Sequence, residues 1–285
     1  MLFVPGTRPD WAAKAVAAGA DAVIMDLEDA VRAADKASAR GAVAAVVAEQ
    51  ADASDGAALL VRINDLSSWA AADDVRAVVR AGLSGVVLPK VSGPADVAVA
   101  ARLLDWAEAE AGLPAGSVAL VPLLETASGL RSAYEVAAES RRVACLGALS
   151  ARDGDIERAL GFRWSAEGTE TLALRSRVLL DARAAGVPNP VTGLWTDIAD
   201  LGGLRRFAEQ NRALGYDGMM AIHPTHVPVI NEVFSPDAAT LDRDRRLLAA
   251  LDASGEGAVV FEGVMIDEAM AATARDRLRR YGGGG

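Results

Sequence analysis

The 285-residue sequence contains one cysteine, two histidines and few aromatic residues. A single cysteine, Cys145, excludes an intrachain disulfide, which fits a reducing compartment. No apolar run approaches the roughly 18 residues that a membrane-spanning helix needs, so we expect no membrane partner. The opening segment MLFVPGTRPD lacks the charged region and apolar core of a secretory signal. We therefore expect a cytoplasmic protein.

Basic charge is also scarce. Lys and Arg number 29 against 39 Asp and Glu, which gives a formal net charge of −10. This balance argues against nucleic acid as the main partner, because phosphate binding requires a basic surface. An anionic small molecule needs only a local cluster of Arg and Lys, so it remains compatible. Hydrophobic residues make up 52% of the chain, enough for a large buried core.

Short apolar runs alternate along the chain with Ala-rich stretches of helical period and Gly-containing turns. The runs are continuously apolar, which is typical of parallel strands covered on both faces. The predicted strands are 2–6, 22–28, 58–64, 85–90, 118–125, 142–148, 186–193 and 218–224. The predicted helices between them are 10–18, 36–51, 70–81, 94–111, 128–140, 165–185 and 200–214.

Repeated strand–helix units predict an α/β fold in which residues 1–224 form a (βα)8 TIM barrel. An open doubly wound sheet is the alternative, but no G-x-G-x-x-G motif follows the first strand. Residues 225–285 contain helix patterns at 238–253 and 267–280 around a short apolar segment. This is too little for a second domain, so we expect a C-terminal helical extension or lid with a flexible Gly tail.

Polar residues gather where the predicted strands end, which is where the chemistry of such barrels lies. They are DLED (26–29), Arg62, Lys90, Glu125, Asp153, Asp155 and His223. A carboxylate at the end of a buried strand is costly without a partner, and Glu125 is in that position. It either forms an ion pair with Arg62 or Lys90, or binds Mg²⁺ with a second carboxylate. The segment SARDGDIERALG offers Asp153, Asp155 and Glu157 as the second carboxylate.

Arg62 allows two interpretations. It forms a structural ion pair with the DLED segment, or it clamps a substrate carboxylate or enolate oxygen with its guanidinium fork. Glu28 and Asp29 would orient metal-bound waters or cap the next helix. Lys90 is most simply a salt-bridge partner inside the barrel mouth.

His223 and His226 in IHPTH are a weak zinc signal, because the chain has no other histidine and Cys145 lies within a predicted strand. Hydrogen bonding of His223 beside Pro224 is the simpler interpretation. The sequence also lacks a G-x-S-x-G nucleophile motif.

Several segments, taken in order, carry a family resemblance: LFVPGTRPD, KAVAAGADAVIMDLEDAV, VRIN, GVVLPKV, LVPLLETASGL, RALGYDGMMAIHPTHVPVINEVFSP and GVMIDEAM. The chain resembles the citrate lyase β-subunit-like branch of the HpcH/HpaI aldolase family. The resemblance implies a (βα)8 barrel that binds Mg²⁺ through Glu125 and Asp155, since DIERALG matches the family's D-x-x-x-x-x-G pattern. It also implies that Arg62 contacts a substrate oxygen. Asp267 of the MID motif would be the acid/base, reaching the site from a neighbouring subunit's lid.

One loop departs from the family pattern. The interval from Gly147 to Asp155 is longer than the usual GxxD spacing, and Gly154 stands where many relatives carry an acidic residue. Because that loop contributes metal and backbone contacts, Gly154 is a candidate substrate contact. Asp153 remains the alternative metal ligand.

The resemblance implies a Mg²⁺-dependent carbon–carbon lyase that cleaves or forms a β-hydroxyacyl-CoA, such as citryl-, malyl- or citramalyl-CoA, through an enolate. The metal would act as a Lewis acid on the developing oxyanion, and Arg62 would add a fixed positive charge. A lid supplied by another subunit predicts a homo-oligomer, a trimer or hexamer by family analogy. Arg8, with Lys14, Arg32 and Lys36, would form a positive rim for the CoA phosphates.

Two other functions stay open. The first is an aldolase of the same family that joins pyruvate and an aldehyde without CoA, using Glu125, Asp155 and Arg62 but not Asp267. The second is a non-catalytic subunit that binds a CoA ester or forms a complex.

Overall fold

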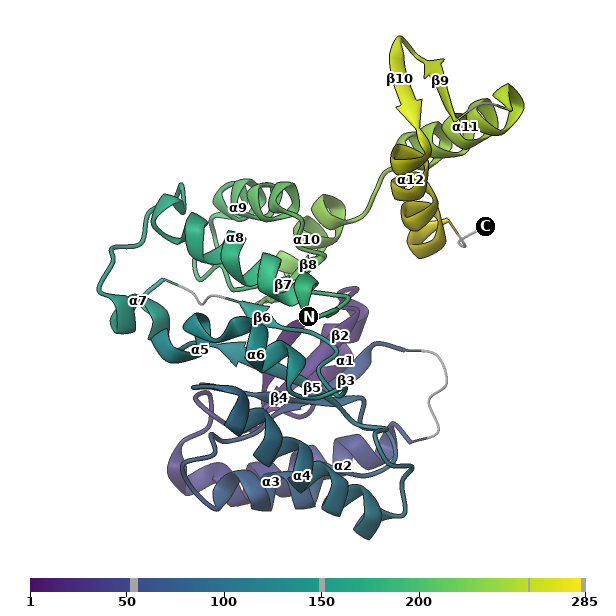
Figure 1. Ribbon diagram of the computed structural model, residues 1–285. Helices are drawn as coiled ribbons and strands as arrows, with labels where there is room; N and C mark the ends of the chain where they lie inside the picture. Colours follow the sequence, from purple (N-terminus) through teal and green to yellow (C-terminus); the bar gives the residue numbers. More distant parts are fainter. Residues whose placement is uncertain (52–55, 149–151, 256, 283–285) are drawn as a thin grey trace. The chain divides into compact units, whose positions relative to one another are not determined.

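The computed structural model describes residues 1–51, 56–148, 152–255 and 257–282. Eight parallel strands pair in chain order. They are β1 (Leu2–Pro5), β2 (Ala22–Asp26), β3 (Ala58–Arg62), β4 (Gly85–Leu88), β5 (Ala119–Leu124), β6 (Gly147–Ala148), β7 (Val191–Thr192) and β8 (Gly218–Met219). Leu2 also pairs in parallel with Ala221, just after β8, so the sheet closes on itself. The closed sheet confirms the predicted TIM barrel and excludes the open doubly wound sheet (Figure 1).

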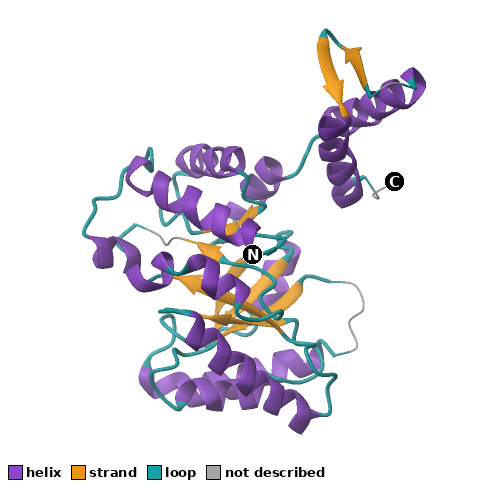
Figure 2. Cartoon of the chain, in the orientation of Figure 1, coloured by secondary structure: helices purple, strands orange, loops and turns teal. Residues whose placement is uncertain are grey.

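Helices flank the strands on their outer side (Figure 2). They are α1 (Trp11–Ala17), α2 (Lys36–Glu49) after a 3-10 turn at Ala33–Asp35, α3 (Ala70–Val78), α4 (Pro94–Ala111), α5 (Ala127–Arg131), α6 (Ala133–Ala138), α7 (Asp155–Leu160), α8 (Thr169–Ala184) and α9 (Leu201–Leu214). The termini of α4 follow sequence rules: Pro94 is its first residue and Gly112 caps it in the left-handed conformation. The predicted helix 128–140 is two helices, because Ser132 has a non-helical backbone.

The inside of the barrel is filled by apolar side chains from facing strands. They are Ala22, Ile24, Leu60, Val87, Val121, Leu123, Cys145, Val191 and Met220, with Met1, Phe3 and Leu194 packed against them. This arrangement resembles the layered interior of other (βα)8 barrels. Burial raises the pKa of the Cys145 thiol to about 12. The cysteine is therefore an inert core residue, as its position in the sequence suggests.

The last three strands are shorter than predicted. The apolar runs 142–148, 186–193 and 218–224 reduce to two paired residues each in β6, β7 and β8. Pro188 and Pro190 have no N–H to donate, which limits pairing before β7. His223 consequently lies beyond the end of β8, in the turn that leads into α10 (His226–Phe234), a helix missing from the prediction.

The chain divides into two compact units, Met1–Asn231 and Glu232–Gly285. The second unit contains α11 (Ala238–Ser254), β9 (Ala258–Phe261), β10 (Val264–Asp267) and α12 (Glu268–Tyr281). Its own core consists of Leu247, Leu251, Ile266, Ala271 and Ala274. The predicted apolar segment is thus an antiparallel hairpin. The division into domains at 224 and 225 stays a prediction, and the Gly tail lies mostly outside the described residues.

Within the described part of the chain, no helix has both the length and the apolar character needed to cross a membrane.

Candidate active site

Arg62 is held in place where β2 and β3 end side by side. Asp26 is its register partner on β2. The guanidinium donates from Nε and Nη2 to the two carboxylate oxygens of Asp26, each at 2.7 Å. Its third nitrogen, Nη1, lies 3.2 Å from Glu28 Oε2, and its carbon lies 5.0 Å from the ring centroid of Phe3. Burial works against the charge, but Asp26 and Glu28 raise the pKa of Arg62 above its ordinary value.

Asp26 is a site residue that sequence reasoning did not single out within the DLED segment. Its side chain is 2% exposed. Its two oxygens also accept the backbone N–H groups of Glu28, at 2.9 Å, and of Ala30, at 3.0 Å. The signal was present in the sequence, because a carboxylate and an arginine end two adjacent parallel strands. Only the register of β2 on β3 makes them partners.

Glu28, Asp29 and Lys90 form a second group of charges beside Arg62. The Lys90 ammonium contacts Glu28 Oε1 and lies 3.0 and 3.2 Å from the two oxygens of Asp29. Burial raises the pKa of Glu28, and the neighbouring Asp29 adds to this, while Lys90 and Arg62 oppose it. The prediction that Lys90 is a salt-bridge partner inside the mouth is confirmed. A role for Glu28 and Asp29 in orienting metal-bound water stays a prediction.

Glu125 follows β5 directly, and the next residue fixes its position. Thr126 caps α5 by accepting the Gly129 N–H at 2.9 Å and donates its hydroxyl to the Val91 carbonyl at 2.7 Å. No described residue forms a hydrogen bond or ion pair with the Glu125 carboxylate. The cations expected to pair with it, Arg62 and Lys90, are engaged by the DLED carboxylates instead.

The electrostatics of Glu125 agree with this lack of a partner. Burial raises the pKa of Glu125 to about 7; the Arg62 charge lowers it, whereas Glu28 and Asp155 raise it further. A half-buried carboxylate that feels two other negative charges is costly unless a cation compensates it.

The two candidates for the second metal ligand differ in their surroundings. Asp155 is the first residue of α7; its side chain is 20% exposed and pairs with Arg158 one turn later. Asp153 is exposed, with a left-handed backbone at φ 59°. Asp155 is among the charges that act on Glu125. Gly154 caps α7, and its contact with substrate stays a prediction. Part of the lengthened loop, residues 149–151, lies outside the described residues.

These residues fit a magnesium ion. The described residues contain no group of three or more His, Cys, Asp and Glu arranged around one metal position. Magnesium does not require such a group, because it commonly binds one or two carboxylates and completes its octahedron with water and substrate oxygens. Glu125, which has no partner in the described part of the chain and feels the Asp155 charge, supplies that donor chemistry.

The two histidines have other surroundings. His223 Nδ1 lies 2.7 Å from the Thr225 hydroxyl, which confirms the predicted hydrogen bonding. His226 is fully buried, and its ring centroid lies 6.2 Å from that of His223.

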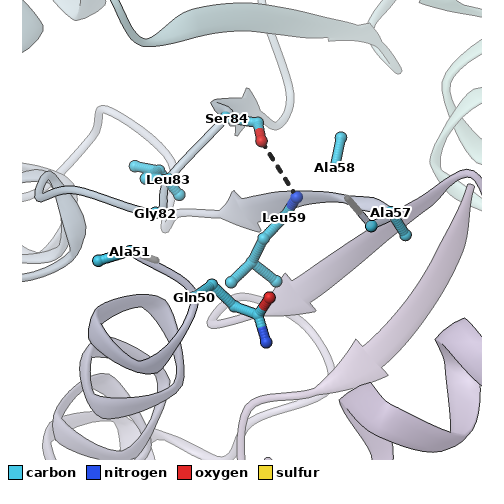
Figure 3. Close-up of a pocket in the computed structure, with 9 residues that line it drawn as sticks. Gln50, Ala51, Ala57, Ala58, Leu59, Gly82, Leu83 and Ser84 are labelled. Atoms are coloured by element: carbon cyan, nitrogen blue, oxygen red, sulfur yellow. Dashed lines mark hydrogen bonds between the residues drawn. The ribbon is translucent and has the colours of Figure 1, made fainter. Parts of the chain in front are cut away.

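A pocket of about 390 Å³ lies elsewhere, where β3 and β4 begin (Figure 3). Its lining includes Gln50, Leu59, Leu83 and Ser84, and the Ser84 hydroxyl accepts the Leu59 N–H at 3.2 Å. None of the described side chains that line the pocket titrates near neutral pH. Chemistry in (βα)8 barrels lies at the opposite, carboxyl ends of the strands, so we do not assign the active site here.

Asp267 ends β10 in the second unit. Its carboxylate caps α12 by accepting the Met270 N–H at 3.1 Å, and the residue is exposed. An exposed carboxylate on a short hairpin is free to meet a ligand, but its role as acid/base stays a prediction.

The predicted CoA rim stays a prediction. The Arg8 guanidinium stacks 4.2 Å from the Trp11 ring and lies 3.3 Å from Asp10, so its role in CoA binding stays a prediction. The Lys36 ammonium donates to the Leu27 and Glu28 carbonyls at 3.3 Å, so the protein itself engages this cation. The Glu28 carbonyl also accepts the Val31 N–H at 3.1 Å.

Comparison with known proteins places this arrangement in a family. A family model described as HpcH/HpaI aldolase/citrate lyase matches residues 1–224. The chain belongs to this family.

Citrate lyase subunit beta of Leuconostoc mesenteroides subsp. cremoris is 34% identical over 278 residues, which cover 96% of this chain and 90% of that protein. A (3S)-malyl-CoA thioesterase of Cereibacter sphaeroides is 33% identical, over 98% of this chain and 93% of that protein. The crystal structure of CitE from Mycobacterium tuberculosis with magnesium, acetoacetate and coenzyme A has a TM-score of 0.76 at 33% identity. It covers 99% of this chain and 97% of that chain. The chain is a lyase of the citrate lyase β-subunit-like branch.

Proposed function

We propose that this lyase is Mg²⁺-dependent and cleaves or forms a β-hydroxyacyl-CoA through an enolate. The observation that carries the proposal is the Glu125 carboxylate. It has no hydrogen-bond or ion-pair partner among the described residues, and its pKa is raised to about 7. A cation bound by Glu125 and Asp155 would compensate that charge. The solved relative with magnesium, acetoacetate and coenzyme A supports the same choice of metal and ligand class.

Each protein group has a defined task in this mechanism. Mg²⁺, when bound, supplies a Lewis acid for the oxygen on which negative charge develops. Arg62 donates its remaining N–H groups to the keto or carboxylate oxygen of the substrate. Because Asp26, Glu28 and Phe3 already fix its guanidinium, little reorganisation is needed as the charge develops.

In the cleavage direction, the β-hydroxyl gives its proton to water, the bond between the α and β carbons breaks, and a carbonyl fragment leaves. The electron pair remains on the acyl-CoA as an enolate, which takes a proton at carbon. Asp267 would donate that proton, and shielding from water would favour the transfer. A lid from a second copy of the chain would provide this shielding, so we propose a homo-oligomer, a trimer or hexamer.

The experiment is a panel of CoA thioesters assayed with Mg²⁺. Citryl-, malyl- and citramalyl-CoA would release oxaloacetate, glyoxylate and pyruvate respectively, each measurable with a coupled dehydrogenase. Glu125→Gln should remove this release. Free CoA with intact hydroxyacid would instead indicate hydrolysis, the activity named for the Cereibacter relative. Binding of a CoA ester without any product would favour a complex subunit, the kind of protein that the Leuconostoc name describes.

Asp267→Asn separates the CoA-dependent reaction from a pyruvate–aldehyde aldolase. The variant should lose acyl-CoA cleavage. If Asp267→Asn keeps the full activity of the wild type, the pyruvate–aldehyde aldolase is favoured.

Light scattering of the purified chain measures the oligomeric state, and a monomer with full activity would contradict the shared lid. The cytoplasmic location stays a prediction.

A further inference from the structure

Lys90, just after β4, has a backbone conformation that lysine rarely adopts. Its φ is 52°, in the left-handed region. Among the described residues only Asp153 and Glu262 share this feature without being glycine. Aspartate tolerates the region well, and Glu262 forms with Gly263 a two-residue hairpin turn that requires positive φ at both positions. Neither explanation applies to Lys90. A strained backbone of this kind is usually retained at functional sites.

The left-handed turn has a structural use that does not need lysine. It directs Val91 toward β5, where the Val91 N–H donates to the Leu123 carbonyl at 3.3 Å. The Val91 carbonyl in turn accepts the Thr126 hydroxyl at 2.7 Å, beside Glu125. Glycine or asparagine would allow the same turn at lower conformational cost. The lysine side chain must therefore contribute something else.

The ammonium is that contribution. It contacts one oxygen of Glu28 and both oxygens of Asp29. The other oxygen of Glu28 lies 3.2 Å from Arg62 Nη1 and accepts the Asp29 N–H at 3.0 Å. Glu28 is thus held on one side by Lys90 and holds Arg62 on the other.

We propose that Lys90 is a positioning residue for the lyase reaction: its ammonium fixes Glu28 and, through Glu28, the guanidinium of Arg62. The chain retains a strained backbone at this position in order to place that ammonium. The inference rests on the proposed function, in which Arg62 meets the developing negative charge.

Neutral variants separate the strain from the charge. Lys90→Met removes the ammonium and keeps the strain, whereas Lys90→Asn removes the ammonium and suits the left-handed backbone. We expect the thermal midpoint of Lys90→Asn to exceed that of Lys90→Met by roughly 2–4 °C. Arg76→Met, which removes an exposed ion pair to Glu110, is the control for loss of a surface cation.

Turnover should depend on whether residue 90 carries a positive charge and not on the thermal stability of the variant. Both neutral variants should lose kcat by about tenfold to a hundredfold, because small misplacements of a charged group are costly in the transition state. The KM for the CoA ester should change little, since CoA contributes most of the binding. Lys90→Arg should restore most of the lost kcat. Wild-type kcat in Lys90→Asn, or no restoration by Lys90→Arg, would overturn the proposal.

A second readout keeps this test separate from the proposed lyase activity. If the wild type releases no keto acid from any thioester, the lyase proposal has failed, and the positioning role is then measured by calorimetry with pyruvate and Mg²⁺. We expect pyruvate to bind Lys90→Met several-fold more weakly than the wild type and Lys90→Arg nearly as well. Equal pyruvate affinity in the wild type and Lys90→Met would refute the positioning role.

Discussion

The ion pair between Asp26 and Arg62 provides the sharpest test of how the site is built. Asp26 accepts four hydrogen bonds, two from the guanidinium and two from backbone N–H groups. Asp26→Asn keeps the shape of the side chain but replaces one carboxylate oxygen with an NH₂ donor. At either position that donor would face both a backbone N–H and an N–H of the guanidinium, because each Asp26 oxygen accepts one of each. Two of the four hydrogen bonds are lost, and a buried arginine charge is left without its main partner.

The expected magnitude follows from the burial of both groups. The side chains of Asp26 and Arg62 are 2% and 13% exposed, so solvent cannot compensate the loss. Breaking a buried ion pair by removing one partner costs about 3–5 kcal/mol. At roughly 2–4 °C for each kcal/mol, the thermal midpoint should fall by about 6–20 °C. Turnover should also fall by at least tenfold, because Arg62 loses its fixed orientation.

A double-mutant cycle isolates the pair. Thermal and denaturant unfolding would be measured for Asp26→Asn, Arg62→Met and the double variant, which no longer buries an unpaired guanidinium. We expect the double variant to be less destabilised than the sum of the single variants, with a coupling energy of about 1–3 kcal/mol. Additive effects within about 0.5 kcal/mol would mean that the two side chains do not depend on each other, which would refute the role of Asp26 in holding Arg62.

Three further predictions concern other buried charges. Glu125→Gln should abolish turnover yet raise the thermal midpoint in Mg²⁺-free buffer at pH 8. Burial raises the pKa of this carboxylate from 4.5 to about 7, so stability is lost as the pH rises from 4.5 to 7 and the full loss remains at pH 8. A lower midpoint for the variant would contradict an unpartnered carboxylate. Although burial opposes it, hydrogen bonds from Arg142 lower the pKa of Glu108 from 4.5 to about 2, so the stabilisation is present above pH 4.5 and lost as the pH falls toward 2. Glu108→Gln should flatten acid denaturation curves over that window, and an unchanged curve would rule out this contribution. Arg175 is fully buried and donates to the Asn211 and Gln210 side chains at 2.7 and 2.6 Å and to the Gly168 carbonyl at 2.8 Å. Arg175→Met leaves these acceptors unpaired, so it should lower the free energy of unfolding in urea by about 2–4 kcal/mol. Wild-type stability of the variant would show that the acceptors find other donors.

Local sequence patterns determined most of the barrel. The eight strands were predictable because most of their apolar residues are buried, as in β2 and β4. The Gly residues after several helices end them for a local conformational reason. The errors in the predicted secondary structure also had local causes. Proline interrupts the predicted strand before β7, and α10 was missed because the sequence pattern after IHP was assigned to the C-terminal arm.

The sequence also determined which charged residues stand at strand ends, but not how they pair. Arg62 contacts Asp26 because the register of β2 on β3 makes them neighbours, and Lys36 donates to two backbone carbonyls and to Asn64. Among the described residues Glu125 has no partner, because Arg62 and Lys90 are already engaged by the DLED segment. Pairing of this kind depends on distances across strands far apart in the chain. Only the closed barrel decides those distances, so only the tertiary structure shows which carboxylate is left for a metal ion.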